Sequence, residues 1–345
     1  MPSSVARLAV AALSLAALIT FSACGSDAER PTASAATATP SGTFPATVEH
    51  KYGTTTVKQA PQRVVVVGIR EQDALLALGT APVATTEWYG EDPGALESWA
   101  KAKLGSAPLP TVLPSSDGIE IERVAAQRPD LIVGIDTAMT DKEYAQLSRL
   151  APTIAPPAGT VDYGASWQQD LQLVGDALGK RAEADKLQAQ VEDQIEQTAA
   201  EHPQWKGKTA INATLSDGSF YVYGPKTANT QLFAQLGFAF PPALRDVGGG
   251  DDFGGTVSNE RADLLDVDLI LWDHHDAKDR AAIGKTPVYA DLAVHEQGRE
   301  VFEQESSPLY DALSKTSVLS VPVALKLLTP RFDAALDGDP STSSD

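Results

Sequence analysis

The segment Glu122-Arg-Val-Ala-Ala-Gln-Arg-Pro-Asp-Leu-Ile-Val-Gly134 returns later in the chain as Glu260-Arg-Ala-Asp-Leu-Leu-Asp-Val-Asp-Leu-Ile-Leu-Trp272. The two copies agree at identical spacing in the pairs Glu122/Glu260, Arg123/Arg261, Asp130/Asp268, Leu131/Leu269 and Ile132/Ile270. Each copy predicts a short helix that begins at its glutamate and leads into a buried strand. A helix-then-strand unit that occurs twice indicates two related halves.

Strands and helices alternate around both copies. Arg63-Val-Val-Val-Val-Gly68 is a continuous apolar run, which is typical of a parallel strand covered on both faces. A helix over 72–78 and a strand over 81–85 follow it. In the second half, the pattern predicts strands over 209–215 and 220–223 and a helix over 230–236. The sequence therefore predicts the α/β class, with two Rossmann-like lobes.

A long helical stretch lies between the two halves, over 166–203. Its apolar side chains recur at helical spacing: Trp167, Leu171, Val174 and Leu178, then, after Gly179, Ala184, Leu187, Val191, Ile195 and Ala199. The part over 181–201 would be about 31 Å long at ~1.5 Å per residue. We expect it to connect the lobes as a rigid helix, although a core helix within one domain would show the same pattern.

The N-terminus has the layout of a secretory signal. Residues 1–23 carry one charge, Arg7, before an apolar run that is shorter than the ~20 residues of a membrane span. The run ends in Phe21-Ser22-Ala23-Cys24, which resembles the lipobox of bacterial lipoproteins, with Phe21 where leucine is usual. The resemblance implies a lipid on Cys24, the single cysteine of the chain. The alternative is an ordinary signal with a chance cysteine.

These features divide the chain into six segments. They are a signal peptide (1–23), a disordered tether (24–45), an N-terminal lobe (46–165), the connecting helix (166–203), a C-terminal lobe (204–335) and a disordered tail (336–345). The net charge of −19 argues against nucleic acid and anionic lipid headgroups as partners. The lipid would therefore hold the protein on the outer face of the cell membrane.

Short motifs in the same order and spacing resemble the siderophore-binding lipoproteins of ABC importers, the iron-complex and cobalamin periplasmic-binding type. The matching pieces begin with Pro61-Gln-Arg-Val-Val-Val-Val-Gly68 and Gln72-Asp-Ala-Leu-Leu-Ala-Leu-Gly79, and they continue through Arg128-Pro-Asp-Leu-Ile-Val133 to Tyr221-Val-Tyr-Gly-Pro225. The resemblance implies a ligand in the cleft between two lobes, little hinge closure, a monomer and an ABC permease as partner. It implies a ferric siderophore as ligand and no cofactor.

Ligands of open parallel sheets bind outside the carboxyl ends of the strands, so the loops there are the candidate site. Aromatic rings suit the rim of a bulky chelate, and a guanidinium can pair with the oxygens of an anionic one. The candidate ligand-binding residues are Arg70, Trp88, Tyr89, Tyr223, Arg245, Phe253 and Trp272. Alternatively, the aromatic residues pack the lobes, and Arg70 pairs with Glu71 or Glu87.

The two repeat glutamates have a second interpretation. In the family, one exposed glutamate on each lobe docks on arginines of the permease, and Glu122 and Glu260 occupy the matching positions. Alternatively, each simply favours a helix N-terminus through the helix dipole.

Other functions have less support. His274-His275-Asp276 is the only histidine cluster, and neighbouring strand residues point to opposite faces, so a zinc or manganese receptor is disfavoured. The sequence has no Gly-x-Ser-x-Gly and no phosphate-binding glycine loop, so we expect no catalytic residues and no enzyme. A receptor for haem or cobalamin on the same fold stays open.

Overall fold

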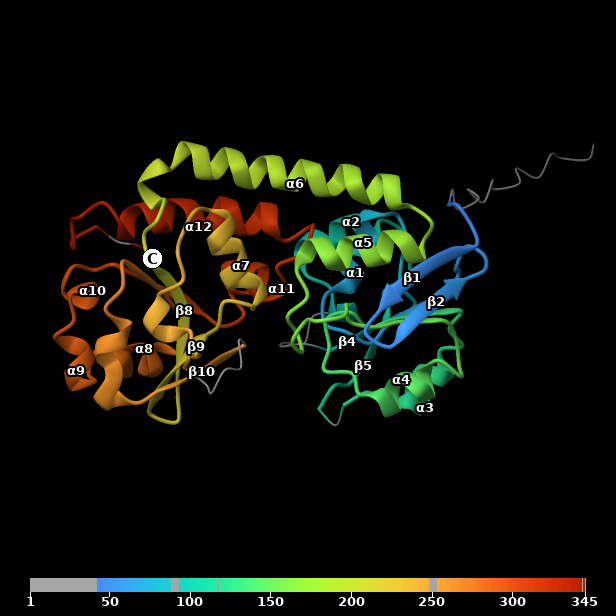
Figure 1. Cartoon of the computed structure of the whole chain (residues 1–345), viewed down its shortest axis with the longest axis horizontal. Helices are drawn as coiled ribbons and strands as arrows, with labels where there is room; N and C mark the ends of the chain where they lie inside the picture. The colour runs from blue at the N-terminus through green and yellow to red at the C-terminus, as the bar shows by residue number, and fades with distance from the viewer. Residues whose placement is uncertain (1–41, 88–92, 117, 248–252, 343, 345) are drawn as a thin grey trace, which may run out of the picture. The chain divides into compact units, whose positions relative to one another are not determined.

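Two five-stranded sheets organise the part of the chain that the structure describes, namely residues 42–87, 93–116, 118–247, 253–342 and 344 (Figure 1). The structure is a computed structural model. Trp88, Tyr89 and Cys24 lie outside the described residues. Each sheet carries helices on its faces, so the prediction of two α/β lobes is confirmed.

The N-terminal lobe is built on a parallel sheet of strand order β5-β4-β3-β6-β7. Its strands are β3 (Val64–Val66), β4 (Ala84–Thr86), β5 (Thr111–Leu113), β6 (Leu131–Val133) and β7 (Thr153–Ile154). Its helices are α1 (Glu71–Ala77), η1 (Pro93–Ala95), α2 (Ser98–Leu104), α3 (Ile121–Ala126), α4 (Asp141–Leu147) and α5 (Trp167–Ala177). A hairpin of β1 (Ala46–His50) and β2 (Gly53–Val57) precedes the sheet. The first repeat copy forms α3 and β6, as its pattern predicts.

The C-terminal lobe has a mixed sheet of order β10-β9-β8-β11-β12, in which β9 runs antiparallel to both of its neighbours. Its strands are β8 (Ala210–Ser216), β9 (Ser219–Tyr223), β10 (Gly254–Val257), β11 (Leu269–His274) and β12 (Glu300–Gln304). Its helices are η2 (Pro203–Trp205), α7 (Ala228–Gln235), η3 (Pro242–Leu244), η4 (Asn259–Leu265), α8 (Ala277–Ile283), α9 (Pro287–Ala290), α10 (Ala293–Glu296), α11 (Pro308–Lys315) and α12 (Val321–Ala335). The second repeat copy forms η4, a 3-10 helix, and then β11.

The connection between the lobes is α6 (Arg181–Glu201), whose 21 residues are those that the sequence predicts. The wider segment 166–203 is not one helix, however. Gly179 adopts a left-handed φ of 64° between α5 and α6, and a side chain there would collide with the backbone of Thr43. The chain therefore reverses, and α5 packs back along α6, where Gln172 Nε2 donates to Gln188 Oε1 at 2.6 Å.

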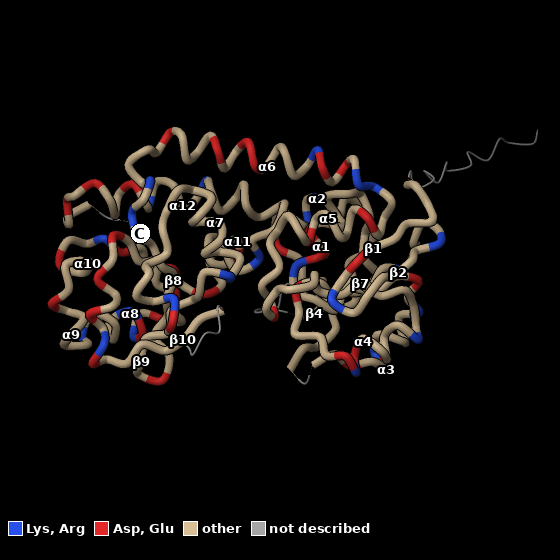
Figure 2. The backbone as a smooth tube through the Cα atoms, viewed as in Figure 1, with Lys and Arg blue, Asp and Glu red and all other residues tan. Residues whose placement is uncertain are grey.

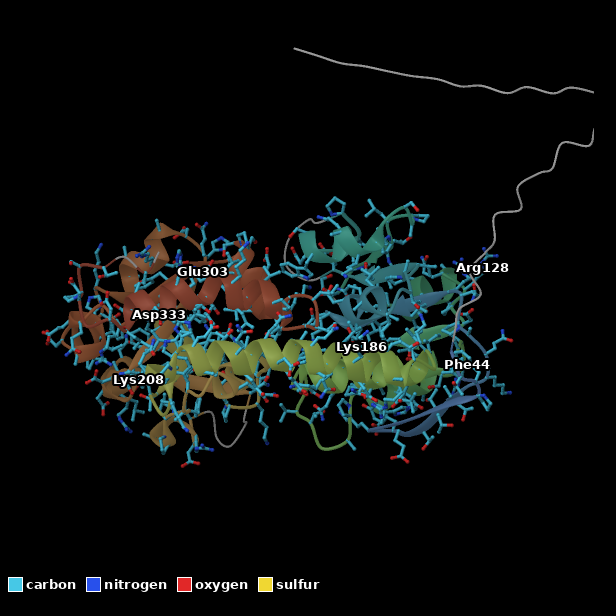
Figure 3. All side chains as sticks on the ribbon, turned by 90° about the horizontal axis from the view of Figure 1, so that it is seen from above. Phe44, Arg128, Lys186, Lys208, Glu303 and Asp333 are labelled. Atoms are coloured by element: carbon cyan, nitrogen blue, oxygen red, sulfur yellow. The ribbon has the colours of Figure 1, made fainter. Side chains whose placement is uncertain are left out.

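The far end of α6 is fixed to α12 of the C-terminal lobe. Trp205 Nε1 donates to Asp333 Oδ1 over 3.1 Å, and His202 Nδ1 lies 3.0 Å from the same atom. Figure 3 labels Asp333, which belongs to α12. Buried apolar side chains of β3, α1, α5, α6, α7 and α12 form one continuous cluster that reaches from one lobe into the other. The lobes thus share part of their core, which favours a fixed arrangement over a free hinge.

Acidic residues are spread over both lobes and along α6 (Figure 2), in keeping with the net charge of −19. No helix in the described part of the chain is long and apolar enough to cross a membrane.

Candidate functional site

A cavity of about 380 Å³ lies between the lobes, and residues of both line it. The N-terminal lobe contributes Ile69, Arg70, Asp136 and Tyr163; the C-terminal lobe contributes Asn212, Tyr221, Tyr223, Thr227, Ala228, Asn229, Phe253, Asp273, Tyr310, Leu313 and Ser314. A smaller hollow of about 160 Å³ on the N-terminal lobe adjoins it through Ile69 and Tyr163.

Sheet topology explains the position of this cavity. In the N-terminal sheet the strand order reverses between β3 and β6, and Arg70 and Asp136 follow these two strands. In the C-terminal sheet it reverses between β8 and β11, which carry Asn212 and Asp273. Ligands of α/β sheets bind where the strand order reverses, at the carboxyl ends of the strands. Here the two reversal points face the same cavity.

Arg70 occupies the wall of the cavity but is fully buried. Its Nη1 donates to the carbonyls of Lys315 and Thr316, each over 3.2 Å, and its Nη2 donates to the carbonyl of Ala165. Its Nε lies 3.3 Å from Asp136 Oδ2. Each guanidinium nitrogen thus faces a protein oxygen. Arg70 joins the loop after β3 to the loop after α11, so the expected pairing with ligand oxygens is not what this geometry favours.

At the junction between the lobes, where Arg70 donates to the C-terminal lobe, a second hydrogen bond has its donor on the C-terminal lobe and its acceptor on the N-terminal lobe. Lys315 Nζ, which is buried, donates to the carbonyl of Ile69 at 2.8 Å. Asp73 in α1 accepts from the Ser317 hydroxyl and from Trp99 Nε1. These contacts tie α1 to the segment between α11 and α12, which leaves the two lobes little freedom to separate.

The pKa values of three buried carboxyl groups around Arg70, those of Glu71, Asp170 and Asp136, are raised. Burial and the nearby Asp136 raise the pKa of Glu71 to about 6, although its Oε1 accepts from the backbone N–H of Asp136 at 2.8 Å. Burial raises the pKa of Asp170 well above its usual value, and the charge of Glu71 adds to the effect. Asp136 shows the same direction, because burial raises its pKa while Arg70 opposes the rise.

On the opposite wall, polar groups emerge from strands that are otherwise apolar. Asn212 is buried in β8, where its Nδ2 donates to the Leu271 carbonyl over 3.1 Å and its Oδ1 accepts from Asn229 Nδ2. Asp273 in β11 is also buried, and burial raises its pKa to about 7 while a hydrogen bond from Asn212 opposes the rise. The C-terminal wall therefore holds a carboxyl group that titrates near neutrality.

Aromatic rings complete the lining. Tyr221 and Tyr223 project from the same face of β9, with ring centroids 5.4 Å apart in an edge-to-face arrangement. Phe253 precedes β10, and Tyr310 comes from α11. Of the predicted residues, the structure thus brings together Arg70, Tyr223 and Phe253.

Two of the predicted residues do not line the cavity. Trp272 is fully buried in the core of the C-terminal lobe, where its Nε1 donates to the Tyr289 hydroxyl at 3.0 Å and to Glu300 Oε1 at 2.9 Å. Its prediction as a ligand contact is wrong, because in β11 its side chain points away from the face that carries Asp273. Arg245 is exposed after η3, outside the lining.

Sequence reasoning missed Asn212, Asp136, Asp273, Tyr163 and Tyr310. Asn212 had a usable signal, since it is a polar residue inside an apolar strand. Asp136 and Asp273 had a weaker one, since each ends or follows a strand. Tyr163 and Tyr310 reach the cavity only through packing of distant segments.

The two adjacent histidines have different surroundings. His274 is buried, whereas His275 is exposed and its Nδ1 lies 3.0 Å from Glu305 Oε2. Among the described residues, no group of three or more histidine, cysteine, aspartate or glutamate side chains is placed to hold a metal ion.

The titration of Asp273 gives a testable pH dependence. Because its pKa is higher in the folded chain, the folded state binds a proton more strongly between about pH 4 and pH 7. Stability should therefore fall as pH rises through this window. We expect Asp273→Asn to remove on the order of 1–2 kcal/mol of the fall between pH 5 and pH 8.

Urea unfolding at a series of pH values measures this difference. Asp291→Asn, at an exposed position after α9, is the control and should leave the pH profile of the wild type unchanged. Parallel profiles for wild type and Asp273→Asn would contradict the assignment.

The fold and the cavity together define a class: a bilobed binding protein that receives its ligand between two α/β lobes. A family model described as periplasmic binding protein matches residues 64–299. The chain belongs to this periplasmic binding protein family, and the resemblance seen in the sequence is confirmed.

Individual relatives agree with the family. The ferric enterobactin-binding periplasmic protein FepB of Escherichia coli O6:H1 is 30% identical, over 80% of this chain and 91% of that protein. The Fe(3+) dicitrate-binding periplasmic protein FecB of Escherichia coli K12 is 26% identical over 58% of this chain, which spans 64% of that protein, under two thirds of its length. A crystal structure of a periplasmic solute binding protein from Mycobacterium smegmatis is 33% identical, with a TM-score of 0.74 over 84% of this chain and 98% of that one.

Proposed function

We propose that the chain is the substrate-binding lipoprotein of an ABC importer, which captures a ferric siderophore and delivers it to the membrane permease. The observation that carries this proposal is the cavity between the lobes, walled by Tyr221, Tyr223, Phe253 and Tyr310. Aromatic faces suit the organic rim of an iron chelate. The names of the relatives support the same ligand class, because they include binders of ferric enterobactin and ferric citrate.

The shared core and the hydrogen bonds at the junction between the lobes support delivery without large closure. A ligand in such a preformed cavity binds mainly through contacts that exist before it arrives. The proposed contacts to ligand are Tyr223 and Phe253, with Trp88 and Tyr89, which lie outside the described residues, as further candidates. The chain would act as a monomer, with the ligand as its transported cargo.

Calorimetric titration of the purified protein with a panel of ferric siderophores tests the proposal. We expect saturable binding of at least one ferric chelate at one site per chain, and none for haem, cobalamin, Zn²⁺ or Mn²⁺. Heat is the readout because none of the described residues that line the cavity is a tryptophan. Binding of haem or cobalamin with no ferric chelate bound would overturn the choice of ligand.

We infer also that a lipid on Cys24 holds the protein on the extracytoplasmic face of the membrane. The chain should therefore be found in the membrane fraction, because two or three acyl chains anchor a protein firmly at ~0.8 kcal/mol per buried CH₂. Cys24→Ala should move it to the soluble fraction, and Ser26→Ala should not. Fractionation followed by immunoblotting measures both, and a membrane-bound Cys24→Ala variant would contradict the anchor.

A further inference from the structure

We propose that the cavity selects ferric chelates without net negative charge and binds most tightly a chelate that carries a free ammonium group. This inference rests on the proposed function, and it concerns the charge of the cargo. It reverses the expectation, drawn from the sequence, that a guanidinium pairs with an anionic ligand.

Each lobe presents one buried carboxyl group to the cavity. Asp136 of the N-terminal lobe is 2% exposed, and its Oδ1 has no hydrogen-bond partner among the described residues. Asp273 of the C-terminal lobe is 8% exposed. A buried oxygen without a partner is costly, and a donor on the ligand would satisfy it. The two carboxyl groups thus favour a ligand that brings N–H groups or positive charge.

The positive charges near the cavity are already engaged. Arg70 is the one arginine or lysine among the described lining residues. Its two Nη atoms donate to three carbonyls, and its Nε, which makes no hydrogen bond, lies 3.3 Å from Asp136 Oδ2. Lys315 is directed to the carbonyl of Ile69. Lys226 is exposed beside the lining residue Thr227 and is not part of the wall. A polyanionic chelate would therefore meet two carboxyl groups and no available guanidinium, which disfavours it.

Two internal segments of five residues each lie outside the described residues, and only their sequences enter here. Their sequences are Trp88-Tyr-Gly-Glu-Asp92 and Gly248-Gly-Gly-Asp-Asp252. Neither contains lysine or arginine, and each contains two acidic residues. The sequence therefore offers no cation from either segment.

The remainder of the wall suits a neutral or cationic chelate. Tyrosine hydroxyls and the amides of Asn212 and Asn229 can contact neutral hydroxamate oxygens without a counter-charge. The faces of Tyr221, Tyr223 and Phe253 can attract an ammonium group. A cation beside Asp273 would also hold that carboxyl ionised at neutral pH, since burial alone raises its pKa to about 7.

Chelates that share one iron centre and differ in charge give the sharpest test. The Fe(III) complex of desferrioxamine B carries a free ammonium, its N-acetylated form is neutral and its N-succinylated form is anionic. Calorimetry at about pH 8 with the full chain should show about tenfold tighter binding of the ammonium form than of the acetylated form. The succinylated form should bind more weakly still, and an Fe(III) tris-catecholate should bind at least about a hundredfold more weakly than the ammonium form.

A matched pair of variants assigns the preference to the cavity. Asp273→Asn should bring the ammonium and acetylated forms close to equal affinity, whereas Asp291→Asn, exposed on the same lobe, should keep the tenfold ratio. If Asp273→Asn does not fold, the wild-type ratios alone decide. Equal affinity across the series, or tightest binding of the tris-catecholate, would overturn the charge inference and leave the proposed function standing. Failure of every ferric chelate to bind would overturn the proposed function itself, and the charge inference with it.

Discussion

Replacing Glu122 and Glu260 together by arginine should abolish import by the permease while leaving the affinity for the ferric ligand unchanged. Uptake of ⁵⁵Fe-labelled ligand by cells measures the first property, and calorimetry on the purified variant measures the second. We expect uptake to fall by at least about tenfold, because each reversal replaces an attraction by a repulsion at the docking surface.

The two glutamates occupy matching positions in the two lobes. Glu122 is in the first turn of α3, between β5 and β6, and Glu260 is in the first turn of η4, between β10 and β11. Since β5 and β10 each run in the same direction as the following strand of their sheet, both helical segments begin at the carboxyl edge. Both side chains are exposed.

The arginine that follows each glutamate in the repeat lies beside another acidic residue, so its charge is partly balanced. The adjacent Arg123 pairs with Glu120 at 2.6 Å, and Arg261 lies 3.5 Å from Asp263. The control is the double reversal of Glu183 and Glu196, which are exposed on α6. That variant should import normally. A loss of ligand affinity in the Glu122/Glu260 variant, or normal uptake by it, would count against docking.

Arg70→Ala should destabilise the folded chain by about 3–5 kcal/mol, because it leaves a buried charge and buried carbonyls without partners. The side chain is fully buried and faces Asp136 and the carbonyls of Ala165, Lys315 and Thr316. Its loss should also loosen the junction between the lobes. The measurement is the free energy of unfolding in urea, together with hydrogen exchange at α1 and α11.

Two further variants separate charge from geometry. Arg70→Lys keeps the positive charge but cannot reach three carbonyls at once, so we expect an intermediate loss. Arg149→Ala removes an exposed arginine from the same lobe and should change stability by less than about 0.5 kcal/mol. An Arg70→Ala variant as stable as wild type would show that the junction does not depend on this side chain.

Local sequence patterns predicted where helices and strands lie in the chain better than how these elements pack against one another. The bounds of α6 follow from a helical apolar stripe between Gly179 and Pro203, both of which stop a helix for local reasons. By contrast, the direction of α5 depends on how the chain turns at Gly179 and packs, which periodicity does not encode. The expected single helix over 166–203 is therefore two antiparallel helices.

In the candidate site, too, local sequence predicted some residues, whereas others depend on how distant segments pack. Tyr223 was found because it ends a strand, and Phe253 because it lies in the glycine-rich segment 245–253. Trp272 was wrongly assigned because apolar β11 is covered on both faces, so alternation alone does not reveal which face meets the cavity. Arg70 was correctly seen as a charge that follows a strand, yet the carbonyl of Lys315, one of its partners, comes from a residue 245 positions away.

By itself, the sequence determined the α/β class, the two-lobe repeat, the long helix and the excess of negative charge, because these depend on local periodicity and composition. Only the tertiary structure decided which strand ends meet, that Arg70 is engaged by the protein, and that Asp136 and Asp273 face one cavity. Those properties arise from contacts between segments far apart in the chain, where burial and neighbouring charge, and not residue type, set what each group can bind.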